Sequence, residues 1–126
     1  MKYQNILLID DDEDDQEIFL TAVGQVSDSV NCHAMSDASD ALEKLSSREI
    51  TPEVIFLDLN MPKMNGQQFL VEIKKREALR NIPIIIFSTT SHLATIQLTK
   101  DLGATDFITK PGKYEDLVSI LNSYVA

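Results

Sequence analysis

The sequence contains a single cysteine, Cys32, so no disulfide can form within the chain, and a reducing compartment is expected. Basic residues are scarce as well: 11 lysines and arginines stand against 20 acidic residues, and the formal net charge is −9. Proteins that bind nucleic acid or an anionic membrane need a basic surface, so this balance argues against direct binding to either. The sequence has no apolar run long enough to span a bilayer, and its start, MKYQN, lacks a signal peptide's apolar core. Together these absences predict a cytoplasmic protein.

The chain has enough apolar residues for one folded domain. Its 126 residues are 44% hydrophobic, an ordinary value for a globular protein, and no low-complexity segment stands out. We therefore expect a single domain over residues 1–126. This length leaves no room for a second domain, so any output of the protein would pass through a partner.

Short apolar runs alternate with apolar stripes at helical spacing along the whole chain. The runs predict strands and the stripes predict helices, with Asp37 capping the second helix, Gly24 ending the first and Gly103 ending the fourth. The expected strands cover residues 5–9, 30–35, 53–59, 82–88 and 106–109, and the expected helices lie around residues 18–24, 38–45, 69–73, 93–102 and 117–124. Such alternation with short links predicts an α/β domain, in which a parallel sheet carries helices on both faces.

Reactive side chains follow four of the five predicted strands. Asp10 and Asp11 follow the first strand, Asp58 lies at the end of the third, Ser88 ends the fourth and Lys110 follows the fifth. In open parallel sheets, ligand sites form outside the carboxyl ends of the strands. We therefore expect these five side chains to gather in one pocket.

The chemistry of that set indicates a phosphoryl site. Carboxylates held close together repel, and one of them would stay protonated unless a cation offset the charge. Mg²⁺ prefers oxygen ligands such as carboxylates, waters and phosphate oxygens, while a lysine or a hydroxyl can pair with an anionic oxygen. Because phosphoryl transfer depends mainly on charge neutralisation and positioning, this combination favours that reaction.

Six acidic residues occur in a row, at positions 10–15. Such a run is normally a disordered tail, but here it follows a predicted buried strand. We expect its first two residues to point into the pocket, and we interpret residues 12–15 as solvated surface. Asp14 and Asp15 would lie in the first helical turns, where the helix dipole favours anions by about 0.3–1 kcal/mol each. No role is assigned to Asp12.

The order and spacing of these motifs resemble the receiver domain of bacterial response regulators over essentially the whole chain. The segment IDDD matches the family's acidic pair, FLDLNMP with MNG matches its phosphoacceptor loop, and TKP matches its lysine motif. The resemblance implies a flavodoxin-like, five-stranded parallel sheet of order 2-1-3-4-5. It also implies roles for the site residues: Asp58 as phosphoacceptor, Lys110 as its lysine partner, Ser88 and Phe107 as switch residues, and Asp10, Asp11, Asp58 and the backbone carbonyl of Asn60 as the Mg²⁺ site.

The resemblance further implies a partner that presents a phosphohistidine, either a histidine kinase or a phosphorelay histidine protein. Phosphorylation would reshape the surface of the fourth helix, fifth strand and fifth helix, which would act on an unidentified downstream protein. The only reactions expected of the domain are its own phosphorylation and dephosphorylation. Whether two copies pair through the same surface stays open. By resemblance we also expect a cis bond between Lys110 and Pro111, although only about 5–6% of X–Pro bonds are cis.

Two other functions remain open from the sequence. A haloacid-dehalogenase-type phosphatase also carries D-x-D after its first strand, and Asp10 would then be the nucleophile of an enzyme that acts on small phosphates. The chain is short for that family, and its loop DLNMPKMNG would be left without a purpose. The second alternative is a receiver-like adaptor that binds partners without being phosphorylated.

Overall fold

The computed structural model describes residues 2–125, and in that range five strands alternate with five helices. All strands pair in parallel in the order β2-β1-β3-β4-β5, so the predicted α/β fold and sheet order are confirmed. The elements are β1 (Asn5–Ile9), α1 (Glu13–Val26), β2 (Asn31–Met35), α2 (Ala38–Ser46), β3 (Val54–Leu57), α3 (Gly66–Lys74), β4 (Ile84–Ser88), α4 (Leu93–Asp101), β5 (Asp106–Thr109) and α5 (Tyr114–Asn122).

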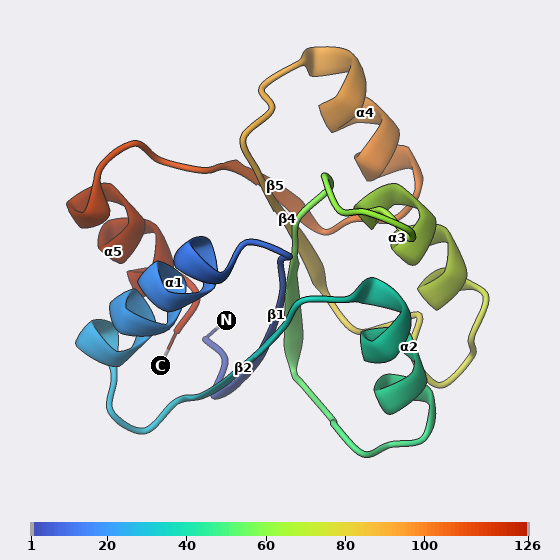
Figure 1. The fold of residues 1–126 in the computed structure, drawn as a ribbon, viewed down its shortest axis with the longest axis horizontal. Coiled ribbons are helices and arrows are strands. Elements are labelled where there is room, and N and C mark those ends of the chain that lie inside the picture. Colours follow the sequence, from blue (N-terminus) through green and yellow to red (C-terminus); the bar gives the residue numbers. More distant parts are fainter. Residues whose placement is uncertain (1, 126) are drawn as a thin grey trace.

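The sheet forms the middle layer of three. Helices α1 and α5 lie on one face of it, and α2, α3 and α4 lie on the other (Figure 1). Along β1, Ile6 and Leu8 belong to the apolar cluster on the α1 and α5 side, whereas Leu7 and Ile9 belong to the cluster on the α2 and α3 side. Strand β1 is therefore buried on both faces, which explains why its sequence is a continuous apolar run rather than an alternating one.

Helix α4 is present where it was predicted, but its apolar stripe does not form a packed face. Leu93 is 82% exposed and Leu98 is also exposed, and Thr99 is the buried residue of this helix. Leu102, just beyond the helix, packs partly against the core. The apolar residues of α4 are too few and too widely spread to cover the sheet, so the helix contacts the domain mainly through its C-terminal end.

The predicted helix caps are partly confirmed. The Asp37 side chain accepts the backbone N–H of Asp40, and Gly103 adopts a φ of +107°, a conformation that favours glycine. The prediction that Gly24 ends α1 is wrong, because the helix continues to Val26. An isolated glycine costs a helix only about 1 kcal/mol, and the neighbouring turns of α1 pack against the core.

The two ends of the described chain lie next to each other. The Tyr3 N–H donates to the Tyr124 carbonyl at 2.7 Å, and Tyr3 bridges to Val125 in parallel, so the described N- and C-terminal segments lie side by side. Within residues 2–125, every helix is too short or too polar to cross a bilayer.

Candidate functional site

The strand order brings the predicted site residues to one edge of the sheet. Strands β1 and β3 are neighbours, with Ile9 level with Leu57, so the residues that follow them, Asp10 and Asp58, lie side by side. The Asp58 N–H donates to the Ile9 carbonyl at 2.9 Å and extends this alignment by one residue. The register of the parallel strands therefore builds the site before any side-chain contact is considered.

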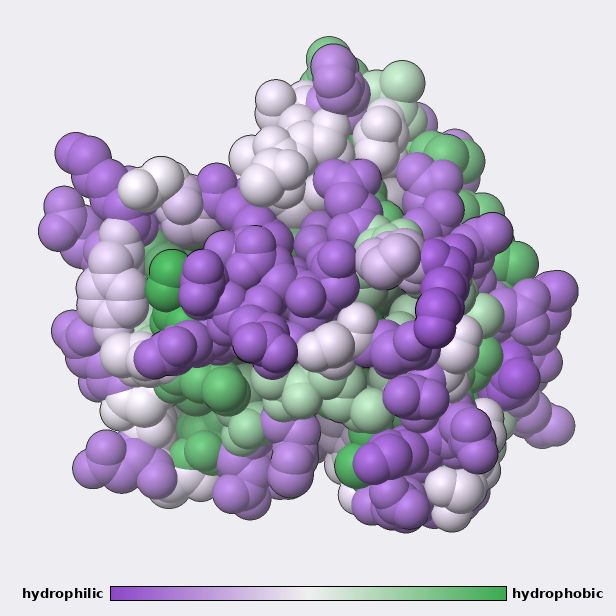
Figure 2. Space-filling model, in the orientation of Figure 1, coloured by the Kyte–Doolittle hydropathy of each residue, from purple (hydrophilic) through white to green (hydrophobic). Residues whose placement is uncertain are grey.

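A group of three carboxylates lies at this edge. One side-chain oxygen each from Asp10, Asp11 and Asp58 lies within 4.8 Å of the others. Asp10 and Asp58 are buried, whereas Asp11 is exposed. In Figure 2, hydrophilic residues gather in the middle of the face, over the loop after β1 and the start of α1. The acidic pair predicted to point into the pocket thus meets Asp58 there.

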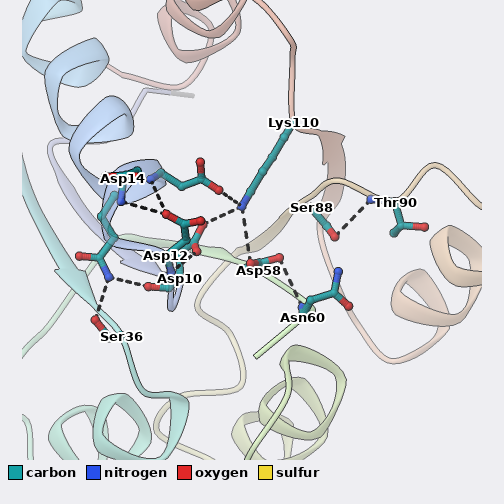
Figure 3. Close-up of polar contacts among 11 residues, drawn as sticks. Asp10, Asp12, Asp14, Ser36, Asp58, Asn60, Ser88, Thr90 and Lys110 are labelled. Carbon is teal, nitrogen blue, oxygen red and sulfur yellow. Dashed lines mark hydrogen bonds and ion pairs between the residues drawn. The ribbon is translucent and has the colours of Figure 1, made fainter. Parts of the chain in front are cut away.

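Lys110 reaches this group from the end of β5, and its side chain is only 12% exposed. The Lys110 N–H donates to the Ser88 carbonyl at 2.7 Å, which ties the start of the β5–α5 loop to β4. Figure 3 shows its side chain extending across the site. Its Nζ atom lies 2.8 Å from Asp10 Oδ2, 2.9 Å from Asp15 Oδ2 and 3.5 Å from Asp58 Oδ2.

These contacts determine the charge state of Lys110. Burial alone would lower the pKa of its ammonium group. The hydrogen bonds to Asp10 and Asp15, together with the charges of Asp58 and Asp10, outweigh burial and raise the pKa above its ordinary value. Lys110 is therefore a permanent positive charge among four carboxylates, those of Asp10, Asp15 and Asp58 and, at the edge of the group, Asp11.

The pKa of the Asp58 carboxyl group is raised, whereas the pKa of an ordinary ion-paired acid is lowered. Burial raises its pKa, the nearby charge of Asp10 raises it further, and Lys110 only partly compensates. The Asn60 N–H approaches Asp58 Oδ1 at 3.4 Å, a long and weak contact (Figure 3). Three carboxylates thus face one lysine in this site. The atoms that could bind a metal ion are all carboxylate oxygens, which suits a hard divalent cation.

The two predicted switch residues lie beside this group. Ser88 is fully buried at the end of β4, and its Oγ atom is 3.5 Å from the Thr90 N–H (Figure 3). Phe107, on the neighbouring strand β5, is partly buried against the apolar cluster on the α2 and α3 side. The structure places both residues on adjacent strands, at the end of the sheet that carries the pocket.

Two contacts in the first turn of α1 were missed from the sequence. Asp12 is the N-cap of α1, because its Oδ1 atom accepts the N–H groups of Asp14 and Asp15 at 2.9 and 3.1 Å. Asp15 was interpreted as solvated surface, but it pairs with Lys110. A cap at Asp12 places Asp15 in the first turn, where side chains point back toward the start of the helix. The sequence therefore predicts that Asp15 lies in the first turn, but it does not predict the contact of Asp15 with Lys110.

The predicted cis bond between Lys110 and Pro111 is wrong, because this bond is trans. A trans X–Pro bond is favoured by about 0.5–1 kcal/mol, so the cis form needs a local cause. Here the backbone contact of Lys110 with Ser88 and its side-chain contacts with Asp10 and Asp15 are made with the trans form.

Comparison with known proteins gives this arrangement its family. Residues 6–122 match the family model of the response regulator receiver domain. The chain belongs to the response regulator receiver domain family. It is 34% identical over 122 residues to the two-component response regulator ORR13 of Oryza sativa subsp. japonica, a match that covers 97% of this chain and 98% of that protein. The match therefore spans nearly the full length of both proteins.

A second relative and a solved structure extend the comparison. The chain is 38% identical over 109 residues to a protein-glutamate methylesterase/protein-glutamine glutaminase of Treponema denticola. This match covers 81% of this chain but only 28% of that protein. The chain also superimposes on the crystal structure of the phosphorylated cyanobacterial phytochrome response regulator RcpA with a TM-score of 0.87 and 27% identity, covering 96% of this chain and 90% of that one. The name methylesterase describes the longer protein and is not transferred to this chain.

The receiver family resolves the choice between the two phosphate-based functions. This chain is a receiver domain of two-component signal transduction, as the motifs predicted. The phosphatase alternative would need Asp10 as an accessible nucleophile. Asp10 is instead fully buried, its Oδ1 atom accepts the Asp12 N–H at 3.0 Å, and its Oδ2 atom is held by Lys110.

Proposed function

We propose that this receiver domain accepts a phosphoryl group on Asp58 from a phosphohistidine of a histidine kinase or a phosphorelay histidine protein. The observation that carries the proposal is the difference between two neighbouring carboxylates. Both oxygens of Asp10 accept hydrogen bonds, at 3.0 Å from the Asp12 N–H and at 2.8 Å from Lys110. The Asp58 carboxylate makes longer contacts with the Asn60 N–H and with Lys110, at 3.4 and 3.5 Å, so its oxygens are held less tightly and are more available to attack.

The carboxylate group fits a magnesium ion as the cofactor of this reaction. Asp10, Asp11 and Asp58 would hold it together with the backbone carbonyl of Asn60. This assignment is supported by the three carboxylates, which each offer an oxygen within 4.8 Å of the others and face Lys110 as their nearby cation. When bound, such an ion offsets negative charge on the phosphoryl oxygens.

The residues of the chain carry out the transfer in a simple sequence. A carboxylate oxygen of Asp58 attacks phosphorus in line, a P–O bond forms, the P–N bond of the phosphohistidine breaks, and the imidazole leaves. Lys110 pairs with one phosphoryl oxygen, for which its Nζ atom is already 3.5 Å from Asp58 Oδ2. Water later hydrolyses the acyl phosphate and restores the carboxylate. These two reactions on itself are the only chemistry we assign to the domain.

Phosphorylation would then change the surface formed by α4, β5 and α5. Ser88 would move to donate its hydroxyl hydrogen to another phosphoryl oxygen, and Phe107 would turn into the space that Ser88 leaves. The positions of these side chains on the neighbouring strands β4 and β5 support such a linked movement. Phe107 has no phenolic hydroxyl, so it can act only through packing. The phosphoryl contacts would bias two existing states, and a downstream protein would read the outcome.

We infer that the receiver domain extends over residues 1–126. The family match covers residues 6–122, and the contact of Tyr3 with Tyr124 joins the segments on either side of it. Cytoplasmic location and absence of direct binding to nucleic acid or membrane stay predictions, and pairing of two copies through the α4, β5 and α5 surface is the possibility that the sequence leaves open.

The experiment that tests the proposal combines Mg²⁺ with a small acyl phosphate or amidophosphate donor and measures the intact mass. One phosphoryl group should be added to the wild-type protein and to Asp28→Asn, a control at an exposed acid, and none to Asp58→Asn. Turnover of a generic phosphate ester that Asp10→Asn removes and Asp58→Asn keeps would support the phosphatase instead. Failure with every donor, a phosphohistidine protein included, would support the adaptor.

A further inference from the structure

Lys110 has one carboxylate partner that lies outside the group assigned to the metal ion. Its Nζ atom contacts Asp10 and Asp15 at nearly equal distances, 2.8 and 2.9 Å, while Asp58 is farther away at 3.5 Å. Asp15 belongs to α1 and not to the set of oxygens that lie within 4.8 Å of one another. The lysine therefore links β5 to α1 as well as to the pocket.

The N-cap of α1 fixes the backbone position of Asp15. Its N–H donates to Asp12 Oδ1 at 3.1 Å, which fixes the first turn of α1. The side chain of Asp15 is 38% exposed, whereas those of Lys110 and Asp10 are 12% and 1% exposed. Of these two close contacts of Lys110, the one with Asp15 is easier to give up, because its carboxylate is rehydrated on release and that of Asp10 would be left buried and unpaired.

We propose that Asp15 is a positioning residue that holds the Lys110 ammonium group in the resting pocket and competes for it with the phosphoryl group. The inference rests on the proposed phosphorylation of Asp58. Asp15 Oδ2 and Asp58 Oδ2 lie 2.9 and 3.5 Å from the Lys110 ammonium group, so negative charge added by a phosphoryl group on Asp58 draws Lys110 toward a phosphoryl oxygen and weakens its pairing with Asp15. Asp15 thus opposes the phosphorylated state, and its release uncouples the β5–α5 loop from the start of α1.

The sequence offers a matched control one residue away. Asp14 lies in the same first turn, carries the same charge and also donates its N–H to Asp12 Oδ1, but it is exposed, and the Lys110 contacts are made by Asp15. Replacing either residue by asparagine removes one unit of negative charge at the same helix terminus. A difference between Asp15→Asn and Asp14→Asn therefore isolates the contact with Lys110 from the general loss of charge.

The first test measures the pairing without metal or phosphate. In chelator, urea unfolding of Asp15→Asn, Lys110→Met and the double variant should be non-additive, whereas the same cycle with Asp14→Asn should be additive. If Lys110→Met does not fold, the ¹⁵Nζ resonance of Lys110 replaces it: Asp15→Asn should shift this resonance and Asp14→Asn should not. Additivity in both cycles, or equal resonance positions in both variants, would overturn the pairing.

The second test measures the competition. After phosphorylation by a small donor, the acyl phosphate of Asp15→Asn should survive about two- to fivefold longer than that of Asp14→Asn, the range expected for a partly exposed ion pair. Asp15→Glu, which restores the charge, should return the lifetime toward the wild-type value. Equal lifetimes in the two asparagine variants would refute the competition. If wild-type protein takes up no phosphoryl group, the Asp58 proposal fails, while the urea cycle still decides the pairing.

Discussion

Lys110 and Asp10 are 100 positions apart in the chain, and their side chains form a 2.8 Å hydrogen bond in the interior of the domain. One residue follows β1 in the middle of the sheet, and the other follows β5 at its edge. The ion pair therefore joins the β5 edge of the sheet to its middle, with Asp58 Oδ2 3.5 Å from the same ammonium group. Replacing Lys110 by an uncharged residue therefore tests whether the pocket depends on this cation.

Lys110→Met should destabilise the metal-free protein by about 3 kcal/mol, because it leaves the buried carboxylate of Asp10 without its charge partner. Added Mg²⁺ should recover part of the loss, because a cation can replace the missing positive charge. Chemical denaturation in chelator and in Mg²⁺ measures both effects. Lys113→Met, at an exposed position, is the control and should change the unfolding free energy little. A Lys110 variant as stable as this control in chelator would contradict the electrostatic account.

Gly66 and Gly24 should respond to alanine in opposite directions. A Cβ atom on Gly66 would collide with the Asp58 carbonyl, so Gly66→Ala should displace the loop after β3 and cost about 1–3 kcal/mol. Gly24 lies inside α1 with open space around its Cα, so Gly24→Ala should stabilise the domain by up to about 1 kcal/mol. Thermal unfolding of the two variants measures the signs, and equal signs would show that the close approach at Gly66 is wrong.

Ser88 should matter for the response to phosphorylation more than for phosphorylation itself. Its hydroxyl makes only a 3.5 Å contact with the Thr90 N–H, so Ser88→Ala should still fold and accept a phosphoryl group. Without the hydroxyl, the phosphorylation-dependent change in the ring resonances of Phe107 should shrink. Thr89→Ala, at the neighbouring exposed position, should leave that change intact. If the Phe107 resonances of Ser88→Ala shift as far as those of the wild-type protein, the movements of Ser88 and Phe107 are not linked.

Cys32 should be an unreactive thiol despite being the only cysteine. Burial raises its pKa from 9.0 to about 12, so at neutral pH its thiolate fraction in the folded protein falls far below that of a free cysteine. In denaturant the alkylation rate should reach half its maximum near pH 9 and then level off, whereas in the native protein it should keep rising at higher pH. A native rate that levels off at the same pH as the unfolded one would contradict the burial of this side chain.

The sheet and the pocket could be predicted because they depend on patterns that the sequence states directly. Continuous apolar runs mark strands buried on both faces, and reactive residues at strand ends must meet at one edge of a parallel sheet. Asp58 and Lys110 were found in this way, although 52 positions separate them. The order of the strands came from the family resemblance, since periodicity alone does not distinguish one order from another.

The features that were missed depend on side-chain direction and on competition between contacts. Asp15 looked like one more exposed acid, because a charge run does not reveal which member faces a lysine from another strand. Leu93 and Leu98 belong to a thin apolar stripe on α4, and both are exposed because so few apolar residues do not form a packed face. The bond before Pro111 was expected to be cis from the resemblance alone, and the local contacts form with the trans bond.

The central claim, that Asp58 is the phosphoacceptor, is tested most directly by locating the acyl phosphate in the wild-type protein. Hydride reduction converts a phosphorylated aspartate into homoserine, and trypsin then separates the candidates, because residues 3–44 contain Asp10, Asp11 and Asp15, while Asp58 is the sole aspartate of residues 49–63. We predict homoserine in the peptide 49–63, only after treatment with Mg²⁺ and donor. Homoserine in the peptide 3–44, or in neither, would contradict the account.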